Sequence, residues 1–498
     1  MTKARRFCFD VRTMFFAAAI AAVSIVGIAT STKHADAFVC RYQQTLGGAI
    51  GDFNNAANWT TCNSAAPSSG DDVVIASGTS TRLSADTRVN VLNTSGTIDA
   101  LEWDFMVTST ATINNGGVVT STGGDLGFGG TLLVGNAGVN ALGSTTGTIN
   151  VSSTAQFLGS TTKLELGSGT TTFFGSFTLA QSATINGNTG KLELRGDTVI
   201  GVATLNMGSA TVLFTGGGTQ SLSYVAVNNT GFGAVKVNKT LATTLTLSGN
   251  GTSTGAFTIE SGTFSGGSSI FRVGGNFSVN ESGTFTPSTG TIEFNGSGAQ
   301  SVSSTNFAVL TINKSGGTVT PLVNTTSTGN FSLLGGTLSL GTKAFDVGGN
   351  FIVNGGVFTP GTATTTLNGS GAQSVSSTAF MGLVIDGGTV TFTGDTTSTA
   401  GVKVMSGSLS LGTNRLNIGG DFVVSGGTFT PSTGLLVLNG AAAQSVSSTN
   451  FEDLTINKSG GTVTPTVNVT STGNLVLLSG TLALGTKALD IGGDFTVN

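Results

Sequence analysis

Charged side chains are scarce in this 498-residue chain, where Asp, Glu, Lys and Arg make up 9% of all residues, against about 25% in an ordinary soluble domain. The basic residues are scattered singly, whereas binding to phosphates needs clustered Lys and Arg, so the composition argues against nucleic acid as a partner. The chain is nevertheless unlike a disordered linker, because 38% of its residues are apolar and occur in short runs. It can therefore bury a long core.

Histidine is almost absent, and the one example, His34, lies within residues 1–37, which have the pattern of a secretory signal peptide. This segment combines a basic start, an apolar stretch over residues 14–29 and the cleavage motif Ala35-Asp36-Ala37. An uncleaved anchor helix is the alternative, but sixteen residues are short for a membrane span. We expect a secreted protein whose mature chain begins at Phe38, and no later segment that crosses a membrane as a helix. Without histidine, the mature chain lacks the base that serine-hydrolase chemistry requires.

Cysteine is also rare. Loss of the signal peptide removes Cys8 and leaves Cys40 and Cys62, which we expect to form one disulfide in an oxidising compartment, worth about 3 kcal/mol. Metal binding by two cysteines without histidine is the less favoured interpretation. The signal peptide carries five basic and two acidic residues, so the mature chain keeps 15 basic and 22 acidic residues, a net charge of −7. No cofactor is predicted, because a glycine-rich phosphate loop would need a following helix and no helical pattern follows one.

Tandem repetition dominates the C-terminal half. The octapeptide over residues 298–305 recurs at 371–378 and, with Ala for its first Gly, at 442–449. Its glutamines stand 73 and 71 residues apart, at Gln300, Gln373 and Gln444. A second marker, Gly-Gly-Asn/Asp-Phe, steps by 74, 71 and 73 residues and ends at Phe277, Phe351, Phe422 and Phe495. A fixed period of this kind predicts units that must stack on their neighbours to make a core.

Short strands broken by turn residues fill the chain from about residue 76, and no segment after residue 37 shows a helical period. We predict an all-β, elongated parallel β-solenoid. At typical strand lengths one period of 71–74 residues holds seven or eight strands, which predicts about three coils per period. An array of immunoglobulin-like sandwiches is the rival, but those domains are longer and tend to carry a core Trp, which the repeats lack.

The predicted organisation has four regions. A signal peptide over 1–37 precedes a disulfide-stapled cap over 38–75, an irregular β-solenoid over 76–210 and a repeat β-solenoid over 211–498. The last region stops in mid-repeat, which would leave an uncapped strand edge. We therefore expect a fragment of a longer reading frame, anchored or secreted through a missing C-terminal region.

Comparison of the copies separates core from surface. One set of positions is expected to face inward in every copy: Ile292, Thr365 and Leu436, with Phe294, Leu367 and Leu438. The position between them is expected to face outward: Glu293, Thr366 and Val437. Because acids are replaced by Asn, Thr or Val in other copies, the array holds no constant pair of carboxylates for acid and base catalysis, and we predict a protein that is not an enzyme. A single copy could still carry a site around Asp395 or Glu452-Asp453.

The repeated glutamines Gln300, Gln373 and Gln444 invite interpretation as a row of ligand-binding groups. The favoured interpretation is structural: stacked amides form a hydrogen-bonded ladder along the solenoid, or each amide satisfies a turn.

Segments such as Leu454-Thr-Ile-Asn457 and Gly-Gly-Thr-Phe-Thr-Pro431 resemble the β-strand-repeat proteins of bacterial cell surfaces. These are similar to autotransporter passenger regions and to filamentous haemagglutinin-like adhesins. The resemblance covers roughly residues 76–498 and brings no catalytic residues with it. It implies a secreted or surface-displayed stalk, often an adhesin or envelope component. From the array itself we predict a structural spacer or adhesive surface, associated with the outer membrane, whose length and repeated Ser/Thr/Asn face allow weak multivalent contacts with host or surface glycans or proteins.

A carbohydrate-binding or polysaccharide-processing β-helix is the alternative function. Its site would lie in the irregular region 76–217, where acids at unrepeated positions surround Trp103: Asp99, Glu102, Asp104 and Asp125.

Overall fold

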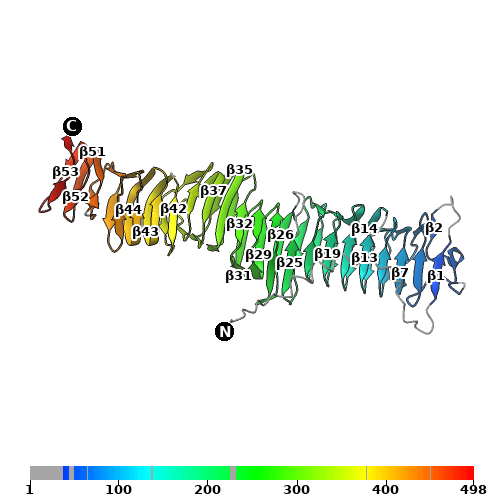
Figure 1. Cartoon of the computed structure of the whole chain (residues 1–498). Coiled ribbons are helices and arrows are strands. Elements are labelled where there is room, and N and C mark those ends of the chain that lie inside the picture. The colour runs from blue at the N-terminus through cyan, green and yellow to red at the C-terminus, as the bar shows by residue number, and fades with distance from the viewer. Residues whose placement is uncertain are drawn as a thin grey trace, which may run out of the picture.

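The chain folds into a single rod of stacked coils (Figure 1). The computed structural model describes residues 38–43, 50–63, 65–135, 138–224, 231–376, 378–448 and 450–498, and the predicted signal peptide lies outside them. About 21 coils follow one another, so at ~4.8 Å per coil the rod is roughly 100 Å long. The prediction of an all-β parallel solenoid is confirmed. Within the described ranges no helix has the length and apolar character needed to cross a membrane.

Most coils contribute three strand segments, which gives the rod three faces, named A, B and C in chain order. Between the face C strands Thr204–Asn206 and Gly251–Ser253, the described residues of that face form only an isolated bridge, from Phe232 to Ser253. Face A is formed by β6 (Thr87–Val89), β9 (Phe105–Val107), β12 (Leu126–Phe128), β15 (Ile149–Val151), β18 (Thr170–Phe173), β21 (Lys191–Leu194), β24 (Thr211–Phe214), β26 (Ala234–Asn238), the first parts of β29 (Phe257–Ser265) and β31 (Phe277–Thr286), β33 (Gln300–Val302), the second parts of β35 (Val309–Pro321) and β37 (Phe331–Ser339), β40 (Val357–Thr359), the first parts of β43 (Thr378–Phe392) and β44 (Thr396–Ser410), β45 (Arg415–Ile418), β48 (Leu435–Leu438), the first parts of β51 (Asp453–Pro465) and β53 (Leu475–Leu482), and β55 (Phe495–Val497).

Face B is formed by β1 (Val39–Tyr42), β4 (Asp72–Ile75), β7 (Val91–Thr94), β10 (Ala111–Ile113), β13 (Leu132–Gly135), β16 (Ala155–Leu158), β19 (Phe177–Ala180), β22 (Thr198–Ile200), β25 (Gln220–Tyr224), β27 (Thr244–Ser248), the second parts of β29 and β31, β34 (Asn306–Phe307), β36 (Thr325–Ser327), β38 (Phe345–Val347), β41 (Thr364–Leu367), the middle parts of β43 and β44, β46 (Asp421–Val424), β49 (Gln444–Val446), and the second parts of β51 and β53.

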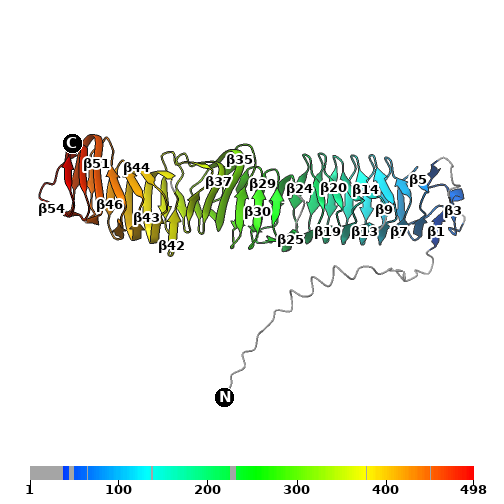
Figure 2. The same cartoon turned by 45° about the horizontal axis from the view of Figure 1, so that its top comes forward.

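Face C is formed by β2 (Gly51–Asp52), β5 (Ser80–Arg82), β8 (Thr97–Asp99), β11 (Val118–Ser121), β14 (Asn140–Ser144), β17 (Thr162–Leu166), β20 (Thr184–Asn186), β23 (Thr204–Asn206), β28 (Gly251–Ser253), β30 (Ile270–Val273), β32 (Thr291–Phe294), the first parts of β35 and β37, β39 (Phe351–Val353), β42 (Ala372–Val375), the last parts of β43 and β44, β47 (Thr428–Thr430), β50 (Asn450–Phe451), β52 (Val469–Ser471) and β54 (Leu489–Ile491). Neighbouring paired strands of each face are parallel. The turned view shows the coils as one continuous stack (Figure 2).

A cap closes the N-terminal end. Here β3 (Trp59–Thr60) follows a short 3-10 turn, η1 (Ala56–Asn58), and lies antiparallel to β1. The Trp59 ring packs edge-on against Tyr42 and Phe53, at centroid distances of 5.1 and 4.7 Å. Its indole nitrogen donates to the Phe53 carbonyl at 2.6 Å, so the buried ring keeps its polar atom satisfied.

The core is a continuous column of apolar side chains on the inside of the three faces. Alternate residues of each strand point inward, so Ile292 and Phe294 are buried while Glu293 between them is only half-buried. Within the array, phenylalanines form the same cluster of three rings in three successive repeats: Phe277, Phe285 and Phe307; Phe351, Phe358 and Phe380; Phe422, Phe429 and Phe451.

One position departs from the expected alternation. Val437 was expected to face outward, as Glu293 does, yet it is buried. Its partners on the two neighbouring strands are Asn417 and Thr455, whose side chains flank it on the outer surface. A small apolar side chain between two polar neighbours is covered by them, whereas a longer acid at this position extends past its neighbours into water.

The repeat period and the coil do not coincide, which corrects the prediction of about three coils per period. Residues paired across neighbouring coils of the array are 17 to 25 residues apart. From Phe271 in β30 to Phe345 in β38, which holds the same position of the next repeat, the chain advances by eleven strand segments, β38 included, because β31, β35 and β37 each cover two faces. Eleven segments make three and two-thirds coils. Strands that bend over a corner without a break account for the undercount from the sequence.

Each repeat is therefore turned by one face relative to the repeat before it. Phe271 lies on face C, Phe345 on face B, Leu416 on face A and Leu489 on face C again. The glutamines follow the same order, with Gln300 on face A, Gln373 on face C and Gln444 on face B. Equivalent residues thus wind around the rod rather than run along one side of it.

Candidate functional site

The repeated glutamines are buried at corners of the solenoid. Gln300 is 2% exposed, and its Nε2 atom donates to the carbonyls of Val273, at 2.9 Å, and Gly275 in the coil below. Gln373 and Gln444 make the equivalent pair of bonds, with 2.9 Å to the carbonyls of Val347 and Ile418. Successive glutamines are more than three coils apart and lie on different faces, so they do not stack into a ladder. Each amide instead satisfies the backbone of one corner.

A lysine completes most of these corners, and sequence reasoning missed it. The ammonium of Lys458, which is 2% exposed, donates to Gln444 Oε1 at 2.5 Å and to the carbonyls of Gly440 and Ala442 at 2.7 and 2.8 Å. Lys314 donates in the same way to Gln300 Oε1 and to the Gly296 carbonyl. These lysines lie in the coil above the glutamine, so each pair joins the corners of three successive coils. The recurring Asn-Lys-Ser-Gly-Gly at 313–317 and 457–461 was the available signal.

The corner at Gln373 lacks this lysine. Where other copies have Asn-Lys-Ser-Gly-Gly, this copy has Asp386-Gly387-Gly388 and is two residues shorter. Gln373 Oε1 accepts from the backbone nitrogen of Gly369 at 3.1 Å, a bond that Gln444 Oε1 also accepts, from Gly440 at 3.2 Å, beside its lysine. The glutamine is thus the constant part of the corner, and the lysine is a replaceable second layer.

Burial lowers the pKa of the ammonium groups of Lys314 and Lys458 below the ordinary value of 10.5. An equivalent pair lies upstream, where Lys239 donates to Gln220 Oε1 at 2.6 Å; burial also lowers the pKa of Lys239, and the charge of Asp197 opposes that shift. Reactive lysines in enzymes have lowered pKa values too, but here every ammonium points at carbonyl oxygens inside the rod and is closed to a substrate. The pairs are therefore structural elements.

The acids proposed for a polysaccharide site mostly serve the backbone. Asp104 Oδ1 accepts from the backbone nitrogen of Asp125 at 2.9 Å, and Asp125 Oδ1 accepts from that of Thr148 at 2.7 Å, one coil further on. Asp99 pairs with Arg82 at 3.5 Å. Glu102, Asp104 and Asp125 are all exposed, and Glu102, next to the half-buried Trp103, is the one of the four acids whose side chain makes no hydrogen bond or ion pair among the described residues.

The same backbone bond recurs in the array with either Asp or Asn. Asn350 Oδ1 accepts from the nitrogen of Ser374 at 2.7 Å, and Asp421 Oδ1 accepts from that of Ser445 at 2.7 Å. Asp and Asn both carry this Oδ1 acceptor and differ in charge, so the bond does not require a charged side chain.

The acids singled out within the array behave alike. Asp395 accepts from the backbone nitrogen of Arg415 at 2.8 Å, and Asp453 from that of Asn474 at 2.7 Å. Glu452 accepts from the Thr472 hydroxyl at 2.6 Å. The structure therefore places them in contacts between coils rather than in a shared site.

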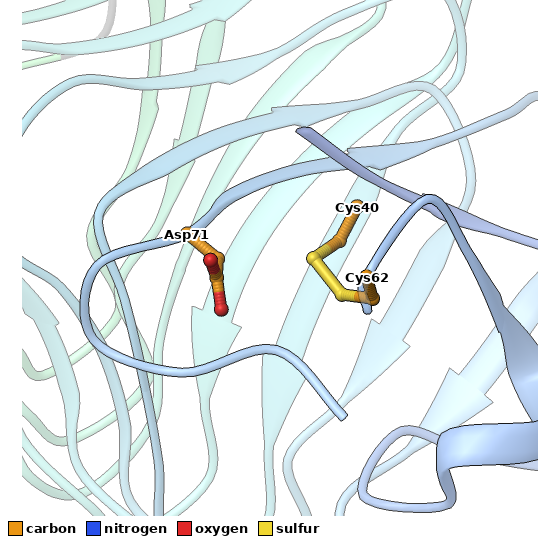
Figure 3. Close-up of side chains that lie close together, drawn as sticks. All are labelled: Cys40, Cys62 and Asp71. Carbon is orange, nitrogen blue, oxygen red and sulfur yellow. A yellow bond between two sulfur atoms is a disulfide. The ribbon is translucent and has the colours of Figure 1, made fainter. Parts of the chain in front are cut away.

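In the cap, Cys40 and Cys62 form a disulfide, with Asp71 beside it (Figure 3). The ligand atoms of these three residues lie within 4.8 Å of one another. The disulfide occupies both sulfurs, however, and metals bind the thiolate form of cysteine, so the cluster does not fit a metal in this oxidised state.

Two enclosed cavities and one open groove stand out among the described residues. Two apolar interior spaces of about 10 Å³ lie in the core, one lined by Phe294, Phe307 and Phe345. A shallow groove of about 260 Å³ lies on face B, where Gly382 and Gly401 carry no side chains, with Thr364 and Asp421 at its rim. Ligand sites are usually deeper and larger than this groove.

No family model matches the chain, and neither a curated protein nor a solved structure matches it.

Proposed function

We propose that this chain is a non-enzymatic, secreted or surface-displayed rod of the bacterial envelope that acts as a structural stalk or adhesin. The observation that supports this proposal most directly is the use of the repeated polar side chains. Gln300, Lys314 and their equivalents are buried and form hydrogen bonds between coils. The polar residues that recur in the sequence therefore hold stacked coils together. An unbroken core over about 21 coils supports a spacer role.

The outward positions support a stalk more than a row of identical binding sites. At one outward position the four copies carry Arg272, Asp346, Asn417 and Asp490. The first and the last of these return to the same face, and they carry opposite charges. Multivalent binding through the repeats would require equivalent outward positions to present the same binding group in a geometry that one partner can engage simultaneously. Any adhesive contact by this chain would therefore depend on local, unrepeated surface.

Surface display is the property to test first. Antibodies against the array are expected to label intact bacteria that express the full chain, and external protease is expected to remove the label. A chain that is found only inside lysed cells would contradict the proposal. Binding of the purified rod to cells and to a glycan array would then separate an adhesin, which binds, from a stalk, which does not.

A polysaccharide-processing β-helix is the second candidate, supported by the exposed Glu102 beside Trp103. Its test is a reducing-end assay on a panel of polysaccharides with the full chain. Release of reducing ends that is lost in Glu102→Gln and kept in Glu281→Gln, an exposed acid of the array, would establish this function and overturn the non-enzymatic proposal.

A further inference from the structure

The cap holds the backbone nitrogen of Phe38 with a buried carboxylate. Asp71 is 8% exposed, and its Oδ1 atom accepts from the Phe38 nitrogen at 3.1 Å. Its Oδ2 atom accepts from both the backbone nitrogen and the hydroxyl of Ser68, each at 2.8 Å. On the other side of the same residue, the Phe38 carbonyl accepts from the nitrogen of Asp72 at 2.8 Å. The position of Phe38 is thus fixed from both sides.

Within the part of the chain that the structure describes, the Asp71 carboxylate has no cationic side chain within ion-pair distance. Among the described residues the ion pairs all involve other acids. Carboxylates that are this buried are normally paired with a charge. The Phe38 nitrogen is the one group in contact with Asp71 that a chemical event can turn into a cation.

We propose that Asp71 is the receptor for the α-ammonium group of a mature chain that begins at Phe38. Hydrolysis of the peptide bond between Ala37 and Phe38 would consume one water, leave the new carboxylate on Ala37 and give Phe38 a free amine that is protonated at neutral pH. The hydrogen bond from an amide to the Asp71 carboxylate then becomes an ion pair in which both the donor and the acceptor are charged. Removal of the signal peptide would complete the cap.

The position of this pair connects processing to the disulfide. Val39 pairs with Asp72 across β1 and β4, and Cys40 follows it directly. Cys40 is 0% exposed and Cys62 is 5% exposed, so a reductant reaches the bond only when the cap opens. A stronger contact between the Phe38 nitrogen and Asp71 should therefore slow reduction of the disulfide at Cys40, two residues further along the chain.

The inference rests on the cleavage expected for the proposed secreted protein, and the experiment separates the two. Four versions of the chain are prepared with defined starts, by removing a fusion that leaves no extra residue: a start at Phe38 or at Ala37, each with Asp71 or with Asp71→Asn. The rate of reduction of the disulfide by dithiothreitol is measured for each. We expect Asp71→Asn to speed reduction about tenfold more in the chain that starts at Phe38, because only there does it remove an ion pair between Asp71 and the Phe38 nitrogen. An equal effect in both starts would overturn the proposal.

Asp72→Asn is the matched control, since Asp72 bonds to the side chain of Asn90 and not to the Phe38 nitrogen through its carboxylate. Its effect should be the same for both starts. If Asp71→Asn fails to fold, acetylation of the Phe38 amine with Asp71 intact gives the same comparison, and an unchanged reduction rate would overturn the proposal.

Sequencing the N-terminus of the chain from a secreting bacterium tests the premise. A start at Phe38 is expected, and a different start overturns the role of Asp71 whatever the reduction rates are. An uncleaved chain retained in the cell contradicts the secreted location itself. A start at Phe38 with equal effects in the four versions contradicts only the role of Asp71.

Discussion

The ammonium nitrogen of Lys239 lies 2.6 Å from the Oε1 atom of Gln220, 19 residues earlier in the chain, and both side chains are buried. The same pair recurs as Lys314 with Gln300 and as Lys458 with Gln444. In each pair the glutamine also donates to two carbonyls of the coil below, so one amide and one ammonium connect three coils.

Replacement of Lys458 by Met should loosen its corner. The change removes the ammonium donor from the carbonyls of Gly440 and Ala442 and from Gln444 Oε1, which keeps only the Gly440 nitrogen at 3.2 Å, and this should cost about 1–3 kcal/mol of local stability. Hydrogen exchange of the amides over residues 439–446 measures this as faster exchange. The exposed Lys403, replaced by Met, is the control and should leave exchange unchanged. Equal exchange in both variants would show that the buried lysine contributes nothing.

The buried lysines should also make stability depend on alkaline pH. Burial lowers the pKa of Lys314 and Lys458 in the folded chain, so between that lowered value and 10.5 the unfolded chain binds more protons. The free energy of unfolding should therefore rise with pH in this window, and the contribution should be fully present above 10.5 and lost as the pH falls through the folded pKa. Urea unfolding between about pH 8 and 10 measures it. The double variant Lys314→Met and Lys458→Met should show a flatter profile, and an identical slope would contradict this account.

Deletion of one complete repeat, residues 345–415, should leave a folded rod. It joins Ala344 to Leu416, which is the equivalent of Phe345, so inward positions stay apolar. The rod should shorten by about 18 Å and residue 416 should move from face A to face B. Electron microscopy measures the length and circular dichroism the unfolding temperature. Deletion of 345–407 is the control, because it brings Ser408 into a buried apolar position and should unfold at lower temperature. Aggregation of the complete-repeat deletion would count against equivalence of the repeats.

Substitutions of Asp125 distinguish a role in accepting a backbone hydrogen bond from a role in catalysis. Asp125→Asn keeps the oxygen that accepts from Thr148 and should leave stability unchanged, whereas Asp125→Ala should cost about 1 kcal/mol. Hydrogen exchange at the Thr148 amide reports the difference. Should polysaccharide cleavage be found and Asp125→Asn abolish it, the backbone interpretation of this acid would fail.

Much of the fold could be read from the sequence, since the repeat period and the alternation of apolar residues predict a parallel solenoid. The number of coils per period could not. Strand β35 runs over Val309–Pro321 and turns a corner in its middle, at a place where the sequence reads as a loop between two strands. Counting strands by their turn residues therefore gives too few strand segments per period. With that count, the rotation of each repeat by one face cannot be predicted from the sequence.

The site was harder to predict for a similar reason. Gln300 stood out because it recurs, but Lys314 lies in a polar segment that is typical of solvent-exposed turns. Only the fold shows that this segment passes over a corner where carbonyls and an amide oxygen face inward. Burial of a lysine depends on partners in other coils, which the sequence around it does not reveal.

The offset between repeat and coil has a genetic consequence. Tandem copies this similar are expected to recombine unequally, so that a gene gains or loses whole copies. Each gain or loss of a copy would change the length of the rod. It would also rotate all coils beyond the change by a third of a turn about the rod axis. Only changes in multiples of three copies would restore the original orientation of the distal coils. The number of copies would therefore decide which face of those coils is presented to a neighbouring molecule.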